Sequence, residues 1–160
     1  MRKRSSYRPR VVLSDPLSLL RPAPKPQRDV VMARFLTALD AMARGDHPGE
    51  AEWRDLSDAI NTVETLALHI DPPKLVAAEV MPLVNDAIAA MVGAAKRFKA
   101  GQRMGVDGPG LQALREVVAV YDKCLHHLTE HEMALAQQET ERRIHAILRS
   151  REPSAEVVAV

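Results

Sequence analysis

The chain has little cysteine, few aromatic residues and no long apolar run near its start. Its 160 residues include one cysteine, Cys124, so no disulfide can form within the chain and a reducing cytoplasm is the expected environment. Aromatic residues make up 3% of the sequence, so the core must be built from aliphatic side chains, which favours helices over a β-sandwich or barrel. The longest apolar run near the N-terminus, Val11 to Leu13, is too short for a signal peptide.

One later segment, residues 75–95, is apolar enough to raise the question of a membrane span. It contains Glu79, Pro82, Asn85 and Asp86. Two carboxylates and an amide in the middle of a span are costly in hydrocarbon. We therefore expect a central, mostly buried helix here and no membrane partner.

Charge is divided unevenly along the chain. Residues 1–28 carry eight cations and one acid, Asp15, whereas residues 29–160 carry 14 cations and 20 acids. The overall net charge of +1 hides this division. A basic arm on an acidic body is typical of proteins that contact nucleic acid or another polyanion, but the pattern identifies no chemistry by itself.

Residues 1–28 are expected to form a flexible, disordered arm. Five prolines prevent a continuous helix, and the alternation at Pro22, Pro24 and Pro26 favours an extended polyproline conformation. Its cations can neutralise phosphates and its tyrosine can stack on a base. An inert solubilising tail and a docking segment for a protein partner are the two alternatives. The candidate nucleic-acid contacts are Arg2, Lys3, Arg4, Tyr7, Arg8 and Arg10.

Helical periodicity and turn residues predict an all-α bundle of about four helices after the arm. Asp71 and Pro72 suit a helix start, and Pro82 should kink or divide the helix that follows. The domain should cover residues 29–150, with a disordered tail over 151–160. The expected helices are 29–44, 50–69, 72–99 and 109–149.

The last of these helices is the longest, about 60 Å at 1.5 Å per residue. The other helices are too short to cover it. We therefore expect the part after about Gln137 to project from the bundle or to form a homodimer. The apolar residues available for such a contact are Ile144, Ile147 and Leu148.

A second basic patch lies near the end of the third expected helix, at Lys96, Arg97, Lys99 and Arg103. Cations at a helix C-terminus are expected from the helix dipole alone. The alternative is that these residues extend a phosphate-binding surface.

The first two expected helices, joined by a glycine-containing turn, invite comparison with a helix-turn-helix reader of DNA. The second helix would be the reader, yet its acids outnumber its one arginine, Arg54, and phosphates would repel such a surface. We expect a plain helical hairpin. The acids are Glu50, Glu52, Asp55, Asp58 and Glu64.

His127, Glu130 and His131 match the H-x-x-E-H pattern of inverted zinc peptidases. A zinc site needs a third protein ligand from another element, and the sequence offers no second metal motif. We expect a solvated polar face, no metal and no cofactor.

Cys124 lies beside an apolar stripe and is expected to be a small buried hydrophobe rather than a nucleophile. The chain is therefore not expected to be an enzyme.

The opening Met-Arg-Lys-Arg-Ser-Ser-Tyr-Arg-Pro-Arg resembles that of a group of small, largely uncharacterised bacterial proteins from prophages and other mobile elements. The segments 36–45 and 53–66 resemble the first hairpin of that group, and Lys96-Arg97-Phe98 and the charged last helix fit its layout. The resemblance implies a phage-associated accessory protein, in some members given the loose label of transcriptional regulator.

Two functions are expected, from different classes. The first is a non-enzymatic accessory protein of the bacterial host cytoplasm that contacts nucleic acid, or a nucleic-acid-bound host complex, through the arm. The second is a protein–protein inhibitor or adaptor that blocks a host defence or transcription machine with its acidic helical body, which would act as a phosphate mimic.

Overall fold

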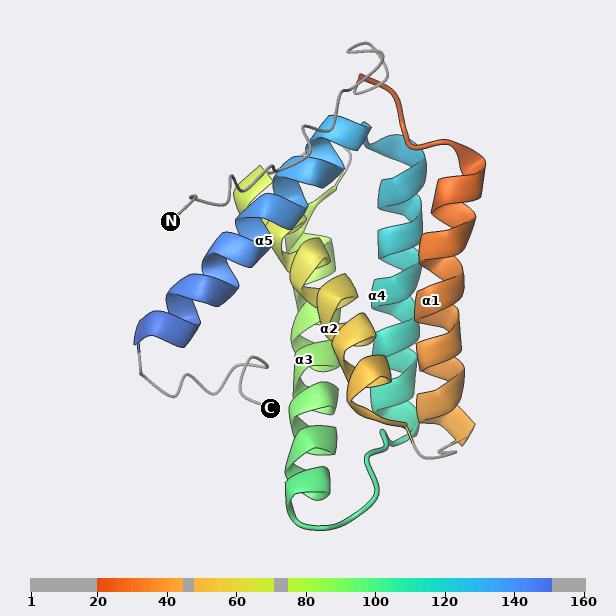
Figure 1. The fold of residues 1–160 in the computed structure, drawn as a ribbon, viewed down its shortest axis with the longest axis vertical. Helices are drawn as coiled ribbons and strands as arrows, with labels where there is room; N and C mark the ends of the chain where they lie inside the picture. The colour runs from red at the N-terminus through yellow and green to blue at the C-terminus, as the bar shows by residue number, and fades with distance from the viewer. Residues whose placement is uncertain (1–19, 45–47, 71–74, 151–160) are drawn as a thin grey trace, which may run out of the picture.

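The computed structural model describes residues 20–44, 48–70 and 75–150, and in these residues it contains helices and no strand (Figure 1). The predicted all-α fold is therefore confirmed. The candidate nucleic-acid-binding residues, which run from Arg2 to Arg10, lie outside the described residues, as does the tail over 151–160. The elements are α1 (Lys25–Arg44), α2 (Glu50–Thr65), the π-helical segment η2 (Leu66–Ile70), α3 (Ala77–Lys99), α4 (Gly108–His127) and α5 (Glu130–Ser150).

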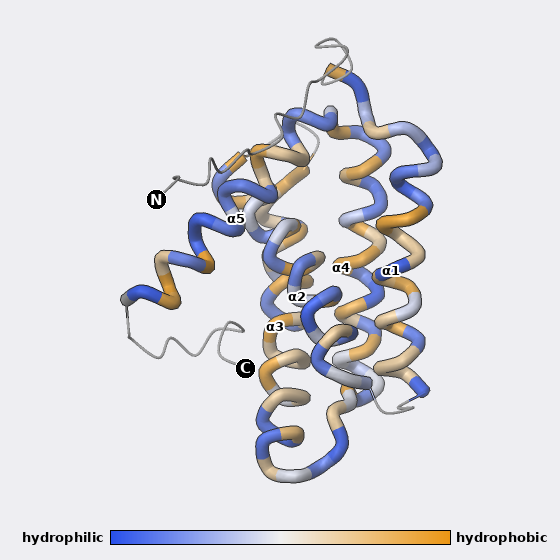
Figure 2. The backbone as a smooth tube through the Cα atoms, in the orientation of Figure 1, coloured by the Kyte–Doolittle hydropathy of each residue, from blue (hydrophilic) through white to orange (hydrophobic). Residues whose placement is uncertain are grey.

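Helix α4 is the centre of the arrangement, because it packs against α1, α2 and α3 (Figure 1). Helix α5 lies across α2 and η2, and its C-terminal end leaves the bundle. Figure 2 shows that α3 and α4 carry many of the hydrophobic residues, whereas α5 is mostly hydrophilic. A single apolar core thus joins α1 to α4, and the first half of α5 adds Met133 and Ala136 to it.

The core is aliphatic, as the composition predicts. Aromatic contact in it is confined to one pair among the described residues, Phe35 and Tyr121, whose rings meet edge to face with centroids 4.9 Å apart. Close packing of branched and flexible aliphatic chains supplies the rest of the apolar burial. The largest fully buried apolar side chains are Met42, Leu56, Ile60, Leu66, Met91, Leu114, Val63, Val84 and Val117.

Helix α1 begins earlier than expected, at Lys25 instead of Asp29. The amides of Gln27 and Arg28 both donate to the carbonyl of Pro24. Pro26 fits because the first turn of a helix has no intrahelical acceptor for its N–H groups. The expected arm over residues 1–28, with polyproline geometry up to Pro26, is therefore wrong for residues 25–28, which are helical.

Helix α3 begins later than expected, at Ala77, and Val76 occupies the N-cap in an extended conformation (φ −87°, ψ 106°). The amides of Glu79 and Val80 donate to the Val76 carbonyl. The expected start at Asp71 and Pro72 is wrong, and residues 71–74 themselves lie outside the described part. Pro82 lies inside α3 without dividing it.

Helix α3 is the one described helix whose length and apolar composition would allow it to cross a membrane. The expectation that it is mostly buried is wrong, since 28% of its most apolar window is buried. The helix lies at the side of the bundle, where one stripe faces α2 and α4 and the other face, with Asn85 and Asp86, is exposed. This is the pattern of an amphipathic surface helix.

The single long helix expected over 109–149 is instead two helices, α4 and α5. The break is a capping box: the Thr129 hydroxyl accepts a hydrogen bond from the Glu132 amide, and the Glu132 carboxylate accepts one from the Thr129 amide (2.7 Å). These bonds satisfy amides that would otherwise be unpaired at the start of α5. The chain turns here, so α5 packs against α2 and η2.

Candidate nucleic-acid interface

The candidate arm residues, Arg2 to Arg10, lie outside the described part of the chain, but the base of the arm is described. The carbonyl of Arg21 accepts a hydrogen bond from the amide of Glu130, at the first residue of α5 (2.8 Å). An amide in the first turn of a helix has no intrahelical acceptor, so Arg21 supplies a partner that Glu130 needs. The chain therefore enters the body at a fixed point beside the α4–α5 junction, where Arg21 is exposed.

The structure places the second basic patch at the C-terminal end of α3 and in the loop after it. Arg97 donates to the carbonyl of Gly105 and so braces this loop. Gly101 has φ 74°, a left-handed conformation that favours glycine and ends the helix. Lys96, Lys99 and Arg103 are exposed. The patch therefore has a structural role through Arg97, while its other three side chains face solvent.

The carboxylates of α2 are all engaged within the described chain. Arg34 of α1 donates to Asp55 (Nε–Oδ1 2.5 Å) and to Asp58 (Nη2–Oδ2 2.7 Å). The exposed face of α2 carries these acids while its other face is in the core, so α1 and α2 form a hairpin whose second helix offers no cationic reading surface. The remaining partners are Glu50 with Arg54, Glu52 with the Gly49 amide, and Glu64 with Arg143.

The histidines of the H-x-x-E-H match do not share a helical face, because the α4–α5 break separates them. His127 is the last residue of α4, whereas Glu130 and His131 begin α5. Within the described residues no group of three or more His, Cys, Asp and Glu side chains is arranged to hold a metal ion. The single helix expected over 109–149 would have placed both histidines on one helix turn, and the break shows that this expectation is wrong.

Cys124 and His127 line the same cleft between α3 and α4, which has a volume of about 540 Å³ and a mainly aliphatic wall. Cys124 is buried, as predicted, and burial raises the pKa of its thiol to about 11. A thiol with this pKa is protonated at neutral pH and is a poor nucleophile. Proximity to His127 therefore does not make a reactive pair.

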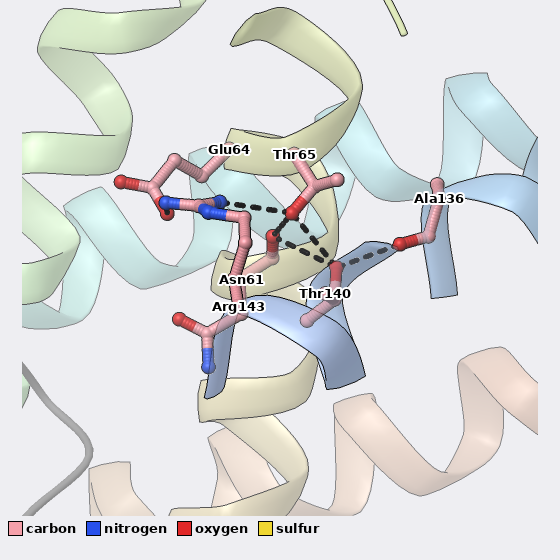
Figure 3. A network of polar contacts seen from close by, with 6 residues as sticks. All are labelled: Asn61, Glu64, Thr65, Ala136, Thr140 and Arg143. Carbon is pink, nitrogen blue, oxygen red and sulfur yellow. Dashed lines mark hydrogen bonds and ion pairs between the residues drawn. The ribbon is translucent and has the colours of Figure 1, made fainter. Parts of the chain in front are cut away.

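A polar network that sequence reasoning missed holds α5 against α2 (Figure 3). The Thr140 hydroxyl is hydrogen-bonded to the Thr65 hydroxyl and to the carbonyl of Ala136, both at 2.8 Å. Arg143 donates to Thr65 (3.0 Å) and to Glu64 (2.9 Å). Thr65 is the last residue of α2, directly before the π-helical segment η2. The network therefore fixes α5 to the point where α2 changes its winding.

A second tether links α5 to the centre of the bundle. Tyr121 of α4 is hydrogen-bonded to Gln137, and burial raises the pKa of the Tyr121 phenol. The phenol therefore keeps its proton at neutral pH. Together with the Thr140 network, this bond positions the first half of α5.

No protein-family model, no curated protein and no solved structure matches this chain.

Proposed function

We propose that this is a non-enzymatic, phage-associated accessory protein of the bacterial cytoplasm, which contacts nucleic acid or a nucleic-acid-bound host complex through its basic arm. The observation that carries the proposal is the division of charge, with six cations and one acid in the 24 residues that precede α1. Cations gathered in this way bind phosphates by releasing condensed counterions, with no need for a folded reading surface.

The described base of the arm supports this role. The bond from the Glu130 amide to the Arg21 carbonyl fixes where the chain leaves the body. The described chain therefore begins at one defined edge of the molecule, beside the α4–α5 junction (Figure 1). A fixed origin raises the effective concentration of the cations near whatever the body contacts.

The alternative, a phosphate-mimicking inhibitor that acts through the acidic body, has less support. A phosphate mimic needs rows of uncompensated carboxylates. On α2 the acids are bonded to Arg34, Arg54, Arg143 and the Gly49 amide. These partners offset the negative potential that mimicry would require.

The experiment is a gel-shift titration of the full chain on a labelled duplex and a labelled single strand at several salt concentrations. The logarithm of affinity should fall with the logarithm of salt with a slope of roughly −4 to −6, if about five to seven phosphates are neutralised. Deletion of residues 2–10 should abolish both the binding and the salt dependence.

A matched control replaces Lys96 and Arg103 of the second basic patch with glutamine and leaves the arm intact. This variant should keep most of the affinity, because the arm supplies most of the phosphate contacts. A flat salt response of the full chain, or unchanged binding after deletion of residues 2–10, would contradict the proposal.

A further inference from the structure

A groove of about 760 Å³ runs between α1 and α4, which lie antiparallel beside each other (Figure 1). On the α1 side it is lined at helical spacing by Asp29, Met32, Leu36 and Ala43. These residues recur at intervals of three, four and seven, so they form one continuous stripe along α1. Leu36, in the middle of the stripe, is 55% exposed.

Helix α4 lines the other side with a stripe of the same spacing, made by Arg115, Ala119, Asp122 and His126. Val118 adds a largely buried apolar floor. Two helices that each present a three-four stripe to the same groove leave the space that a third helix fills in a bundle. The groove therefore has the shape to accept a helix.

The carboxylates in the groove are already paired with cations of their own helix. Each pair joins residues four apart, so Asp29 and Asp40 are compensated before any partner arrives, whereas Asp122 is compensated only by a protonated histidine. The pairs are Asp29 with Lys25 (2.6 Å), Asp40 with Arg44 (2.9 Å) and Asp122 with His126 (3.5 Å, when the imidazole is protonated).

Two arginine side chains of the groove have no carboxylate partner among the described residues. Within the described residues, the side chains of Arg28 and Arg115 form no ion pair and no hydrogen bond, and the Nε atom of Arg28 is buried without a partner. A buried donor on a charged group is costly to leave unpaired, and a carboxylate is the acceptor that suits it best. These two arginines outnumber the one carboxylate of the groove without a permanently charged partner, Asp122, so the uncompensated charge of the groove is positive.

We propose that the α1–α4 groove binds an acidic amphipathic helix of a partner protein. Its apolar side would cover Met32 and Leu36, and its carboxylates would pair with Arg28 and Arg115. The segment from Arg115 to His126 is about 16 Å long at 1.5 Å per residue, so the partner helix needs about three turns with acids near both ends. A second copy of this chain fits less well, because a two-fold contact would bring the same unpaired arginines together.

The test uses the full chain and two labelled alanine-based helical peptides of about 15 residues. Both carry leucines at intervals of three and four, and they differ only in having glutamates or lysines beside that stripe. Fluorescence anisotropy should show that the glutamate peptide binds and the lysine peptide does not. The substitution Leu36→Asp should weaken binding about tenfold, because it places a charge in the middle of the apolar stripe of α1.

Charge reversal at the rim gives a second, independent readout. Arg115→Glu should weaken the glutamate peptide about fivefold and strengthen binding of the lysine peptide. The matched control is Arg103→Glu, an exposed arginine outside the groove, which should change neither affinity. Circular dichroism of each variant confirms that the helices are retained.

Equal binding of the two peptides, or no binding of the glutamate peptide, would overturn the proposal. Loss of binding with Arg103→Glu, or binding that survives both Leu36→Asp and Arg115→Glu, would show that the peptide contacts another basic surface such as the arm. A homodimer that Leu36→Asp dissociates would assign the groove to a second copy and overturn it as well.

Discussion

At the scale of single residues, Thr140 and Thr65 have the most consequence for the shape of the molecule. They are 75 positions apart in sequence, yet their buried hydroxyls lie 2.8 Å apart. Thr65 also donates to the Asn61 carbonyl (2.8 Å) and accepts from Arg143. Polar groups buried between two helices hold one arrangement of those helices, because any shift leaves donors or acceptors unpaired.

The substitution Thr140→Val should destabilise the fold by about 1–2 kcal/mol, because it keeps the side-chain volume but removes a buried hydroxyl and its bond to Thr65. Urea unfolding followed by circular dichroism measures this. The double variant with Thr65→Val should cost less than the sum of the two single changes, since both act on one bond. Thr37→Val, at an exposed position on α1, is the matched control and should have little effect. Additive losses would contradict a direct coupling.

Cys124 should react slowly with thiol reagents, because burial raises its pKa from an ordinary 9.0 to about 11 and keeps the thiolate scarce. At pH 8 a disulfide-exchange reagent should modify the folded chain far more slowly than the chain in urea. Between these two pKa values the unfolded chain gives up a proton that the folded chain retains, so stability should decrease as pH rises through that window. Rapid stoichiometric labelling of the folded chain would contradict this.

At the scale of elements, the α4–α5 break shows how a local signal competes with periodicity. The apolar stripe of α4 continues through Leu125 and Leu128 into α5, so its spacing alone predicts one helix. Thr129 and Glu132 form a capping-box pair that was readable in the sequence and that begins a new helix. A search for this pair would have found the break.

The close approach of α3 and α4 depends on a glycine that the sequence presents only as part of a loop. A Cβ at Gly110 would lie 2.8 Å from the Cβ of Ala90 on α3. The Gly110 amide also donates to Asp107, which caps the start of α4 (2.8 Å). The start of α4 near Pro109 was predictable from these turn residues, but the contact with Ala90 was not, because it joins two helices.

We propose that the distal part of α5 forms a homodimer contact. Leu148 is 59% exposed and Ile144 is half-buried, and both lie beyond the last bond of α5 to α2, made by Arg143. Light scattering at tens of micromolar should report a dimer, and Leu148→Asp should convert it to a monomer. Leu68→Asp, a change at another exposed leucine, is the matched control and should leave the dimer intact. A monomeric parent chain, unchanged by Leu148→Asp, would exclude the contact.

At the scale of the whole molecule, the structure shows how the acidic body and the basic N-terminal segment differ in the charge that they leave unpaired. The acids of the body are largely offset inside it: Arg34 of α1 and Arg143 of α5 both reach carboxylates of α2. The body therefore uses part of its own positive charge to hold its helices together. The excess of cations in the residues before α1 is then the main basic feature open to a partner, which is why the arm, and not the hairpin, carries the proposed function.

The sequence by itself determined the all-α class, the aliphatic core and the positions of most helices. It also predicted that Cys124 is buried and that α1 and α2 form a hairpin. These follow from periodicity, turn residues and helix propensity, which act over one or two turns of chain. Only the tertiary structure decided that α3 lies at the side of the bundle, that Thr140 meets Thr65, and that α1 and α4 leave a groove between them. Such features depend on which helical faces meet, and amphipathic stripes of similar composition can pair in several ways until packing and buried hydrogen bonds select one.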